Sequence, residues 1–525
     1  MPHRLSLCLA FLVLTTTVFA QRKRAKIRWS ERFKINNLGT PHQLLIADDE
    51  ALYAPRSPRG LFSSNQRFAI DKYDKQRLRL KRQETFNLRY EKSASEYDFV
   101  LPFGERLWLF LSNNDRSAKT NRLLAQEISL DRLEEIGEPR LVATADAKLL
   151  REGEFDYQIS PDSTHLLIYN TQPIKRREAE TFDLRIFNRD MTLQWERSVT
   201  LPYTRDLFDV KNLQVDDQGN AYVLGVVFSE RFRLRRNRQA TYRYVVLAYR
   251  PGGEAAEYTV DLADVFINGM ALRVNDRGEL ICNGLYSNRN TGLAKGAFYA
   301  RIDPESKAIV AQNLKEFDID VITQRMGGLA KNIAERREEK GNKRRAPELA
   351  SYAIRDIILR SDGGSVMLAE QFFVTQSTTT TNGVTNTTYT YHYNDILVTN
   401  IRPDGEIEWT VRVPKGQRTT DDGGYASSFV HAVSQGKIHL LFNDHPKNYK
   451  RAERRVRPRV FAGRKKTAFT LASIDTRGDV TYRSIGEGKK AKAILLPRRS
   501  QQVGKHEIGV IGKWRRKFRI GVVEL

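Results

Sequence analysis

The sequence predicts an all-β chain, specifically a β-propeller of about eight four-stranded blades. Three observations predict it. One turn recurs along the whole chain between strand-like segments. A second turn falls within most of the repeats, and the last repeat lacks a fourth strand that a segment near the N-terminus could supply. Seven blades are the alternative, if the first unit, residues 40–88, is irregular.

The recurring turn is rich in Asp, Asn, Gly and Pro, the residues that tight turns need. A mostly apolar, β-prone stretch follows each copy, for example Leu166–Tyr169 or Ala221–Leu224. The first spacings between copies are nearly constant, and the later ones are longer by about one loop insertion each. Such a unit is typical of propellers. The copies are Ala47–Glu50, Phe103–Glu105, Ser160–Ser163, Asp216–Gly219, Asn275–Gly278, Ser361–Gly364, Ser434–Lys437 and Val503–Lys505.

The second turn is predicted between the third and fourth strands of a unit, as at Asn188–Asp190 and Pro403–Gly405. The strand after it can carry tryptophan two residues beyond an aliphatic residue, as Trp195 and Trp409 do. Period-two spacing places both side chains on one face of the strand. We therefore expect the tryptophans to pack against the neighbouring blade.

The two ends of the chain are complementary. After Phe518–Val523 the chain ends without a fourth strand, whereas Ile27–Arg32 has the fourth-strand pattern, including Trp29. We therefore expect an N-terminal strand to pair with the C-terminal blade and close the ring, which would remove an exposed sheet edge. The alternative is that Trp29 matches the pattern by chance.

Residues 1–20 have the features of a signal peptide: Arg4, the apolar stretch Leu5–Val18, and a small-residue cleavage site ending at Ala20. A retained anchor is the alternative. No later segment is apolar enough to span a membrane as a helix. Residues 21–525 are predicted to form one propeller domain with insertions at about 319–349, 375–393 and 447–466. Cleavage would leave Cys282 as the single cysteine, so we expect a buried thiol and no disulfide.

The chain is strongly basic, with a formal charge of +24. Such charge favours acidic surfaces, and export makes lipid headgroups, acidic glycans or acidic envelope proteins the expected partners, with no nucleic acid. Basic tracts are candidates for a polyanion-binding surface, although each alone could be a solvated loop. They comprise Arg231, Arg233, Arg235 and Arg236; Lys450, Arg451, Arg454, Arg455 and Arg457; and a third tract from Lys513 to Arg519.

Catalytic signatures are weak. The mature sequence has no CxxC, HExxH, GxSxG or P-loop motif, so we predict no catalytic residue, no metal site and no cofactor. Aromatic, amide, imidazole and carboxylate groups do gather after the Thr-rich segment, and this mixture suits sugar or peptide recognition. The alternative is that these polar side chains only form hydrogen bonds with backbone groups of the loops. The candidate binding residues are Tyr391, His392, Tyr393, Asn394, Asp395, Asn443, Asp444 and His445.

Short segments resemble known propeller repeats. Ser160–Leu166 resembles the motif of TolB-type propellers, and Pro403–Trp409 is similar to the repeat of pyrroloquinoline-quinone-type propellers. The quinone-dependent enzymes of the latter group typically have adjacent cysteines at the cofactor, which this chain lacks. Residues 351–448 more broadly resemble uncharacterised exported proteins of Gram-negative bacteria. That resemblance implies an envelope location, periplasmic, outer-membrane-associated or secreted, and no particular activity.

Two functions remain open from the sequence. The first is a non-enzymatic exported binding or scaffolding protein, in which a rigid propeller displays partner-binding loops and a basic surface. The alternative is a hydrolase or lyase that acts on polysaccharide or peptide at the propeller mouth. Asp395, Asp444, His392 or His445 would then perform acid–base work.

Overall fold

The computed structural model describes residues 25–525, except 58–66, 92, 149–150, 173–174, 231–234, 237–238, 263–264, 290–291, 307, 340–346, 382–383, 450–457 and 464–465. The predicted signal peptide, residues 1–20, lies outside these residues. In the described part the chain is almost entirely β-structure, with a propeller-like arrangement. No helix there is long and apolar enough to cross a membrane.

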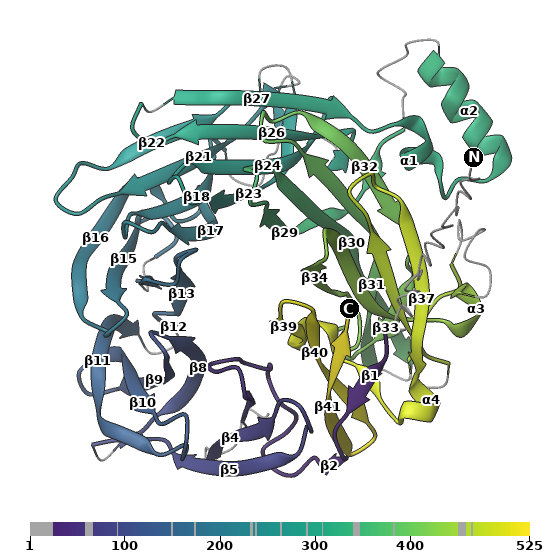
Figure 1. The fold of residues 1–525 in the computed structure, drawn as a ribbon. Helices are drawn as coiled ribbons and strands as arrows, with labels where there is room; N and C mark the ends of the chain where they lie inside the picture. The colour runs from purple at the N-terminus through teal and green to yellow at the C-terminus, as the bar shows by residue number, and fades with distance from the viewer. Residues whose placement is uncertain are drawn as a thin grey trace, which may run out of the picture.

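Antiparallel sheets follow one another in chain order, and Figure 1 shows their first strands on the inner side of the molecule. We number the eight sheets of three or more strands from the N-terminus. The first sheet contains β3 (Ala51–Arg56), β4 (Arg67–Asp74) and β5 (Leu80–Asn87), and the second contains β8 (Glu96–Phe103), β9 (Arg106–Asp115), β10 (Thr120–Ile128), β11 (Glu135–Lys148) and β12 (Arg151–Glu152). The third sheet contains β13 (Phe155–Ile159), β14 (His165–Thr171), β15 (Ala179–Asn188) and β16 (Leu193–Thr204). The fourth contains β17 (Phe208–Val215), β18 (Ala221–Phe228), β21 (Tyr242–Tyr249) and β22 (Ala256–Val260).

The last four sheets carry the insertions. The fifth sheet contains β23 (Phe266–Val274), β24 (Leu280–Ser287), β26 (Gly296–Asp303) and β27 (Ala308–Glu316), and the sixth contains β29 (Tyr352–Leu359), β30 (Ser365–Thr381), β31 (Val384–Ile401), β32 (Ile407–Val413) and β33 (Gln417–Thr420). The seventh sheet contains β34 (Val430–Ser434), β35 (Lys437–Asp444), β36 (Ala468–Ile474) and β37 (Val480–Glu487). The eighth contains β38 (Ile494–Leu495), β39 (Gln501–Gly504), β40 (Glu507–Trp514) and β41 (Lys517–Glu524) with β1 (Ile27–Trp29) and β2 (Phe33–Lys34).

Both predicted turns occur where the sequence places them. The recurring turn joins two consecutive strands of a sheet, as Asp216–Gly219 does between β17 and β18, except that the first copy, Ala47–Glu50, precedes β3. The second turn joins the third and fourth strands, as Pro403–Gly405 does between β31 and β32. In both examples the turn ends in a glycine with positive φ, 78° at Gly219 and 90° at Gly405. Such backbone favours glycine because a Cβ would be strained there.

The two tryptophans connect neighbouring sheets, as expected. Trp195 Nε1 of β16 donates a hydrogen bond of 3.0 Å to the carbonyl oxygen of Gly219 in the fourth sheet. Trp409 Nε1 of β32 donates one of 2.9 Å to the carbonyl oxygen of Thr476 in the seventh sheet. Each indole therefore fixes the outer strand of one sheet to a turn of the next.

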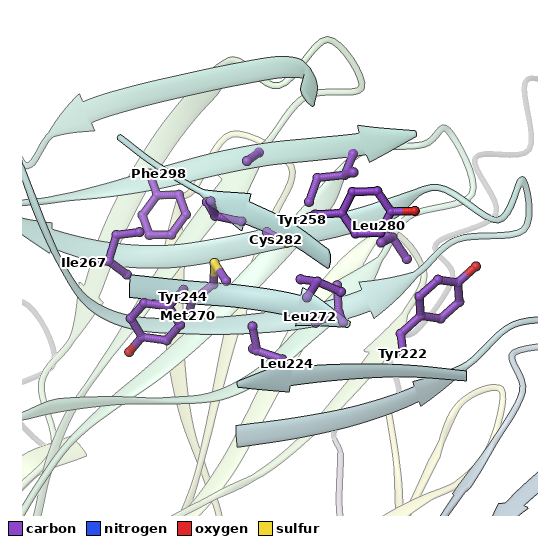
Figure 2. Packing of buried hydrophobic residues seen from close by; sticks show 14 of the residues in the cluster. Tyr222, Leu224, Tyr244, Tyr258, Ile267, Met270, Leu272, Leu280, Cys282 and Phe298 are labelled. Atoms are coloured by element: carbon purple, nitrogen blue, oxygen red, sulfur yellow. The ribbon is translucent and has the colours of Figure 1, made fainter. Parts of the chain in front are cut away.

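Apolar clusters fill the spaces between consecutive sheets. The cluster between the fourth and fifth sheets, shown in Figure 2, includes Leu224, Tyr244, Met270 and Cys282. Cys282 is fully buried and free, as predicted, and burial raises its pKa to about 12. Corresponding clusters occur at the other successive junctions. A further cluster joins the first sheet to the eighth, because it contains Leu52 together with Ile511.

The predicted pairing of the chain ends is present. β1 is antiparallel to β41, with Ile27 opposite Val523 and Trp29 opposite Gly521. The backbone nitrogen of Ser30 donates to the carbonyl oxygen of Ile520 at 2.9 Å. The N-terminal strand thereby becomes part of the C-terminal sheet, on the open side of β41.

The insertions add local structure. Residues 319–349 contain α1 (Ile319–Thr323) and α2 (Gly328–Glu339), and residues 375–393 extend β30 and β31 into a hairpin, as the sequence predicts. The insertion at 447–466 begins within α3 (Pro446–Tyr449), and its residues 450–457 and 464–465 lie outside the described part. The remaining small elements are β6 (Arg89–Tyr90), β7 (Ser93–Ala94), β19 (Arg235–Arg236), β20 (Gln239–Ala240), β25 (Leu293–Ala294), β28 (Leu349–Ala350), α4 (Gly488–Ala491) and the short 3₁₀ helix η2 (Pro497–Arg499).

Candidate functional site

The residues predicted to bind a ligand lie at the base of the long hairpin and on the strand of the next sheet. Tyr391 to Asp395 belong to β31, and Asn443 and Asp444 end β35. Asp395, Asn443 and Asp444 are buried, and His445 follows β35 with partial exposure. The structure therefore places the two groups of residues on adjacent sheets.

Asp395 is surrounded by donors from the protein itself. Arg412 Nε and Nη2 lie 2.8 and 2.7 Å from Asp395 Oδ2, and Arg325 Nη1 lies 3.1 Å from Oδ1. The backbone nitrogen of Lys415 donates to Oδ1 at 3.0 Å. These four donors occupy the carboxylate, so Asp395 holds the sheet to the Arg325 segment and offers no free oxygen for acid–base chemistry.

A fully buried ion pair lies beside Asp395. Lys415 Nζ lies 2.7 Å from Glu370 Oε1, and it also donates to the carbonyl oxygen of Tyr393 and to Gln417 Oε1, both at 3.0 Å. Burial lowers the pKa of Lys415, and Glu370 opposes that effect. Arg355 Nη2 approaches Glu370 Oε2 to 2.9 Å from the other side. Sequence analysis did not identify this pair, because neither residue belongs to a recognisable motif.

The two predicted groups meet through Gln417. Its Nε2 donates to the carbonyl oxygen of Asn443 at 2.8 Å, while its Oε1 accepts from Lys415. Asn443 Nδ2 in turn donates to the carbonyl oxygens of Ala426 and Leu495, at 2.7 and 2.8 Å. Asp444 Oδ1 accepts from Asn448 Nδ2 at 2.7 Å. These contacts are those of the alternative given above, in which the polar side chains form hydrogen bonds with the backbone and with one another.

The aromatic and imidazole side chains of the predicted site are partly exposed, except for Tyr393, which is buried. His392 stacks on Phe373 with ring centroids 4.4 Å apart, and burial followed by Arg418 lowers its pKa. The Tyr393 ring has the guanidinium of Arg498 5.6 Å from its centroid. Asn394 Nδ2 donates to Gln371 Oε1 at 3.2 Å. Burial also lowers the pKa of His445, ahead of the effect of Arg459. Ligand binding by this group stays a prediction.

The first two basic tracts fall largely outside the described residues. Arg235 and Arg236 form strand β19, and the side chains of this tract are not described. The residues outside the described part are Arg231, Arg233, Lys450, Arg451, Arg454, Arg455 and Arg457. A polyanion-binding surface therefore stays a prediction. Within the described ranges, no group of three or more His, Cys, Asp or Glu side chains could hold a metal ion.

A pocket that sequence analysis did not identify lies where β13 of the third sheet meets β17 of the fourth. We call it the inner pocket, because Figure 1 shows both strands on the inner side of the molecule. Its volume is about 990 Å³. It is lined by Glu154, Phe155, Asp156, Tyr157, Gln158, Tyr169, Thr171, Glu180, Arg205, Asp206, Phe208, Asp209, Val210, Lys211, Asn212, Leu213 and Phe228.

Two nearly buried polar residues of the inner pocket have no partner in the described protein. The side chains of Tyr169 and Glu180 belong to residues that are each 5% exposed. The Tyr169 hydroxyl makes no hydrogen bond to any described residue. Glu180 likewise shows no hydrogen bond or ion pair to its carboxylate from the described chain. Buried polar groups are nearly always paired, so an unpaired group that lines a pocket is a candidate contact for a ligand.

Burial is the largest contribution to the pKa shifts of both Glu180 and Tyr169. It raises the pKa of Glu180, and Arg205 partly offsets that effect. Burial also raises the pKa of Tyr169 well above its usual value, and the next contribution comes from the Glu180 carboxylate. The two groups are therefore electrostatic neighbours. A perturbed carboxyl in a pocket is typical of a functional site.

The inner pocket has a sequence signal, although a weak one. An aromatic residue precedes an aspartate on the first strand of the third and fourth sheets, as Phe155-Asp156 and Phe208-Asp209. Tyr97-Asp98 repeats it in the second sheet, where Phe99 stacks on Tyr157 at 4.2 Å between ring centroids. Aligning the repeats by their turns superimposes Tyr97-Asp98 on Phe155-Asp156, whereas Phe208-Asp209 lies two residues further from its turn.

Comparisons with known proteins identify no family. No family model matches the chain, and no curated protein matches it. Among solved structures, it is similar to a variant of the Synechocystis apocarotenoid oxygenase, with 10% identity, 96% of this chain and 94% of that chain covered, and a TM-score of 0.35. It is also similar to polysaccharide lyase Uly1, with 8% identity, 95% and 100% coverage, and a TM-score of 0.35. Similarities this low carry no argument about function.

Proposed function

We propose that this chain is a non-enzymatic, exported ligand-binding protein and that the inner pocket is its binding site. The observation that carries the proposal is the pair of nearly buried, unpartnered polar groups, Tyr169 and Glu180, in a pocket of about 990 Å³. That volume lies at the upper end of the range for small-molecule sites. The pocket also combines aromatic walls with polar and charged groups that can fix the orientation of a ligand.

Energetics support a ligand in this position. Leaving the buried Tyr169 hydroxyl unpaired costs about 1–3 kcal/mol, and the Glu180 carboxylate beside it has no ion pair within the described chain. A ligand that hydrogen-bonds both groups recovers this cost on binding. By contrast, the polar groups of the sequence-predicted site, such as Asp395 and Asn443, already have protein partners.

We also propose that the eight sheets are blades of a closed ring. Support comes from the cluster that joins the first sheet to the eighth and from the pairing of β1 with β41. A ring of this kind would hold β13 and β17 in a fixed relation, because neighbouring blades on both sides support them. A rigid pocket loses little conformational entropy when a ligand binds.

The binding function is tested by thermal unfolding of the full chain against a panel of saccharides, amines and carboxylic acids. A true ligand raises the unfolding temperature, and Tyr169→Phe reduces that shift. Tyr299→Phe is the matched control, because the Tyr299 hydroxyl is also buried without a partner but lies outside the pocket. A ligand shift equally reduced by both variants, or no shift with any compound, would contradict the proposal.

An enzyme acting on polysaccharide or peptide is the second candidate, and the raised pKa of Glu180 favours it. A carboxyl whose pKa is raised by burial can serve as a general acid. The assay incubates the chain with bacterial polysaccharides and peptides and measures new chain ends. Turnover that Glu180→Gln abolishes would support the enzyme. Ligand binding without turnover leaves the binding function.

A further inference from the structure

The inner pocket is acidic although the chain as a whole is basic. Its lining includes the carboxylates of Glu154, Asp156, Glu180, Asp206 and Asp209. The cations in the lining are Arg205 and Lys211. An anionic site in a chain of formal charge +24 is contrary to the overall field of the protein.

Ion pairs within the protein neutralise part of the negative charge of the inner pocket. Lys211 pairs with Asp209, and Arg176 lies 3.9 Å from Asp206. No ion pair to Glu154, Asp156 or Glu180 occurs in the described part of the chain. Arg205 is the remaining cation of the lining, and its Nη1 donates to the carbonyl oxygen of Gln172 at 3.1 Å. The lining therefore holds three carboxylates without an ion pair in the described chain, together with one guanidinium.

Aromatic rings form much of the remaining wall. Phe155, Phe208 and Phe228 belong to the lining, together with Tyr157 and Tyr169. The face of an aromatic ring attracts a cation through its quadrupole. Carboxylates combined with aromatic faces suit an organic cation, because the ring faces contact its alkyl part while a carboxylate balances its charge.

We propose that the inner pocket binds an aliphatic ammonium group, carried by a small diamine or by the lysine side chain of a peptide, with Glu180 as its counter-ion. This inference rests on the proposed binding function. An ammonium group donates up to three hydrogen bonds and accepts none. It can therefore pair with the Glu180 carboxylate and with the lone pairs of the Tyr169 hydroxyl together.

The ionisable groups around Glu180 are consistent with its role as the counter-ion of a bound ammonium group. The charged group that acts on the Glu180 carboxyl is the guanidinium of Arg205. The carboxylates of Glu180 and Asp156 both act on the Tyr169 hydroxyl. Burial raises the pKa of Glu180. A bound ammonium favours the ionised carboxylate, so binding weakens as the pH falls through that raised pKa and releases protons near it.

Isothermal titration of the full chain with 1,5-diaminopentane and with N-acetyl-lysine methylamide tests the inference and separates the two sources. Pentan-1-ol is the uncharged control, and cellobiose is the saccharide control. We expect at least one amine to bind, Glu180→Gln to weaken it at least about tenfold, and Glu254→Gln to leave it within about twofold. Glu254 is an exposed carboxylate outside the pocket.

The outcomes separate the inference from the proposed function. Amines that bind no better than pentan-1-ol, or that bind Glu180→Gln equally well, would overturn the inference. If cellobiose then binds and Tyr169→Phe weakens it, the pocket is still a binding site. If no probe binds in this assay or in the unfolding panel, the inference and the proposed function both fail.

Discussion

Lys415 Nζ lies 2.7 Å from Glu370 Oε1, and both side chains are fully buried between the base of the long hairpin and the next sheet. Removing Lys415 leaves the buried Glu370 with Arg355 as its remaining counter-ion, so we expect a cost of about 3 kcal/mol, the lower end of the range for breaking a buried pair. We expect Lys415→Met to lower the free energy of unfolding by that amount in urea denaturation. Lys81→Met is the control, because Lys81 makes an exposed pair with Asp74 at 3.5 Å. Equal small effects of both substitutions would contradict the prediction.

Glu180→Gln should stabilise the unliganded protein near neutral pH. The pKa of Glu180 is raised by burial above its usual value of 4.5, so the folded state holds its proton to higher pH than the unfolded state does. Ionisation therefore destabilises the fold above the raised pKa, and this penalty vanishes below pH 4.5. We expect a gain below about 1 kcal/mol at pH 7, since solvent in the pocket screens the charge.

The measurement for Glu180→Gln is urea denaturation of both proteins at several pH values. The gain should shrink as the pH falls towards 4.5. A gain that is independent of pH, or a loss of stability at pH 7, would show that the carboxylate has a stabilising partner.

Gly405→Ala should destabilise the protein more than Gly252→Ala. Both glycines have positive φ, 90° and 62°, so an added Cβ is strained at either position. At Gly405 the Cβ would also lie 2.7 Å from the Tyr299 ring, whereas nothing lies within 4 Å at Gly252. We expect a loss of about 1 kcal/mol for Gly252→Ala and about 1–3 kcal/mol more for Gly405→Ala. Equal losses in urea denaturation would contradict the tight packing between the fifth and sixth sheets.

Deleting residues 21–34 should destabilise the C-terminal sheet and promote aggregation. The deletion removes β1 and β2, which both pair with β41, and leaves that strand with an open edge. We expect a lower unfolding temperature and concentration-dependent light scattering. Deleting residues 21–25 is the control, because it leaves β1 and β2 intact. Identical behaviour of the two deletions would contradict the closed ring proposed above.

Shortening the hairpin should leave the fold intact. Residues 374–381 of β30 are exposed, whereas Tyr389 to Tyr393 are held by Asp421 and β33. Replacing residues 377–388 by Asn-Gly therefore removes residues that are exposed wherever their side chains are described, apart from the partly exposed Thr388. We expect a change of less than about 0.5 kcal/mol in the free energy of unfolding. A larger loss would show that the tip packs elsewhere.

The same variant tests the scaffold hypothesis. A partner captured from envelope extract in high salt by the full chain, and lost with the shortened hairpin, would assign the hairpin to partner binding. Retention of that partner by the variant would exclude the hairpin as its site.

Local patterns were sufficient to predict the strands and turns. Turn residues such as Asp216–Gly219 and alternating apolar strands depend on neighbours in sequence, so their structure follows from local stereochemistry. The contacts of Trp195 and the pairing of Trp29 with β41 were also predictable, because the repeat carries the same positions from one unit to the next.

The pocket and the ion pairs depend on tertiary structure. Tyr169 and Phe208 line one pocket because β13 of one sheet adjoins β17 of the next. Whether Glu180 or Asp395 has a partner depends on side chains distant in sequence. Arg412 and Arg325 reach Asp395, and no counterpart from the described chain pairs with Glu180. Residue type sets which chemistry is available. The packing of neighbouring sheets decides which polar groups remain free, because burial and pairing are properties of the assembled fold.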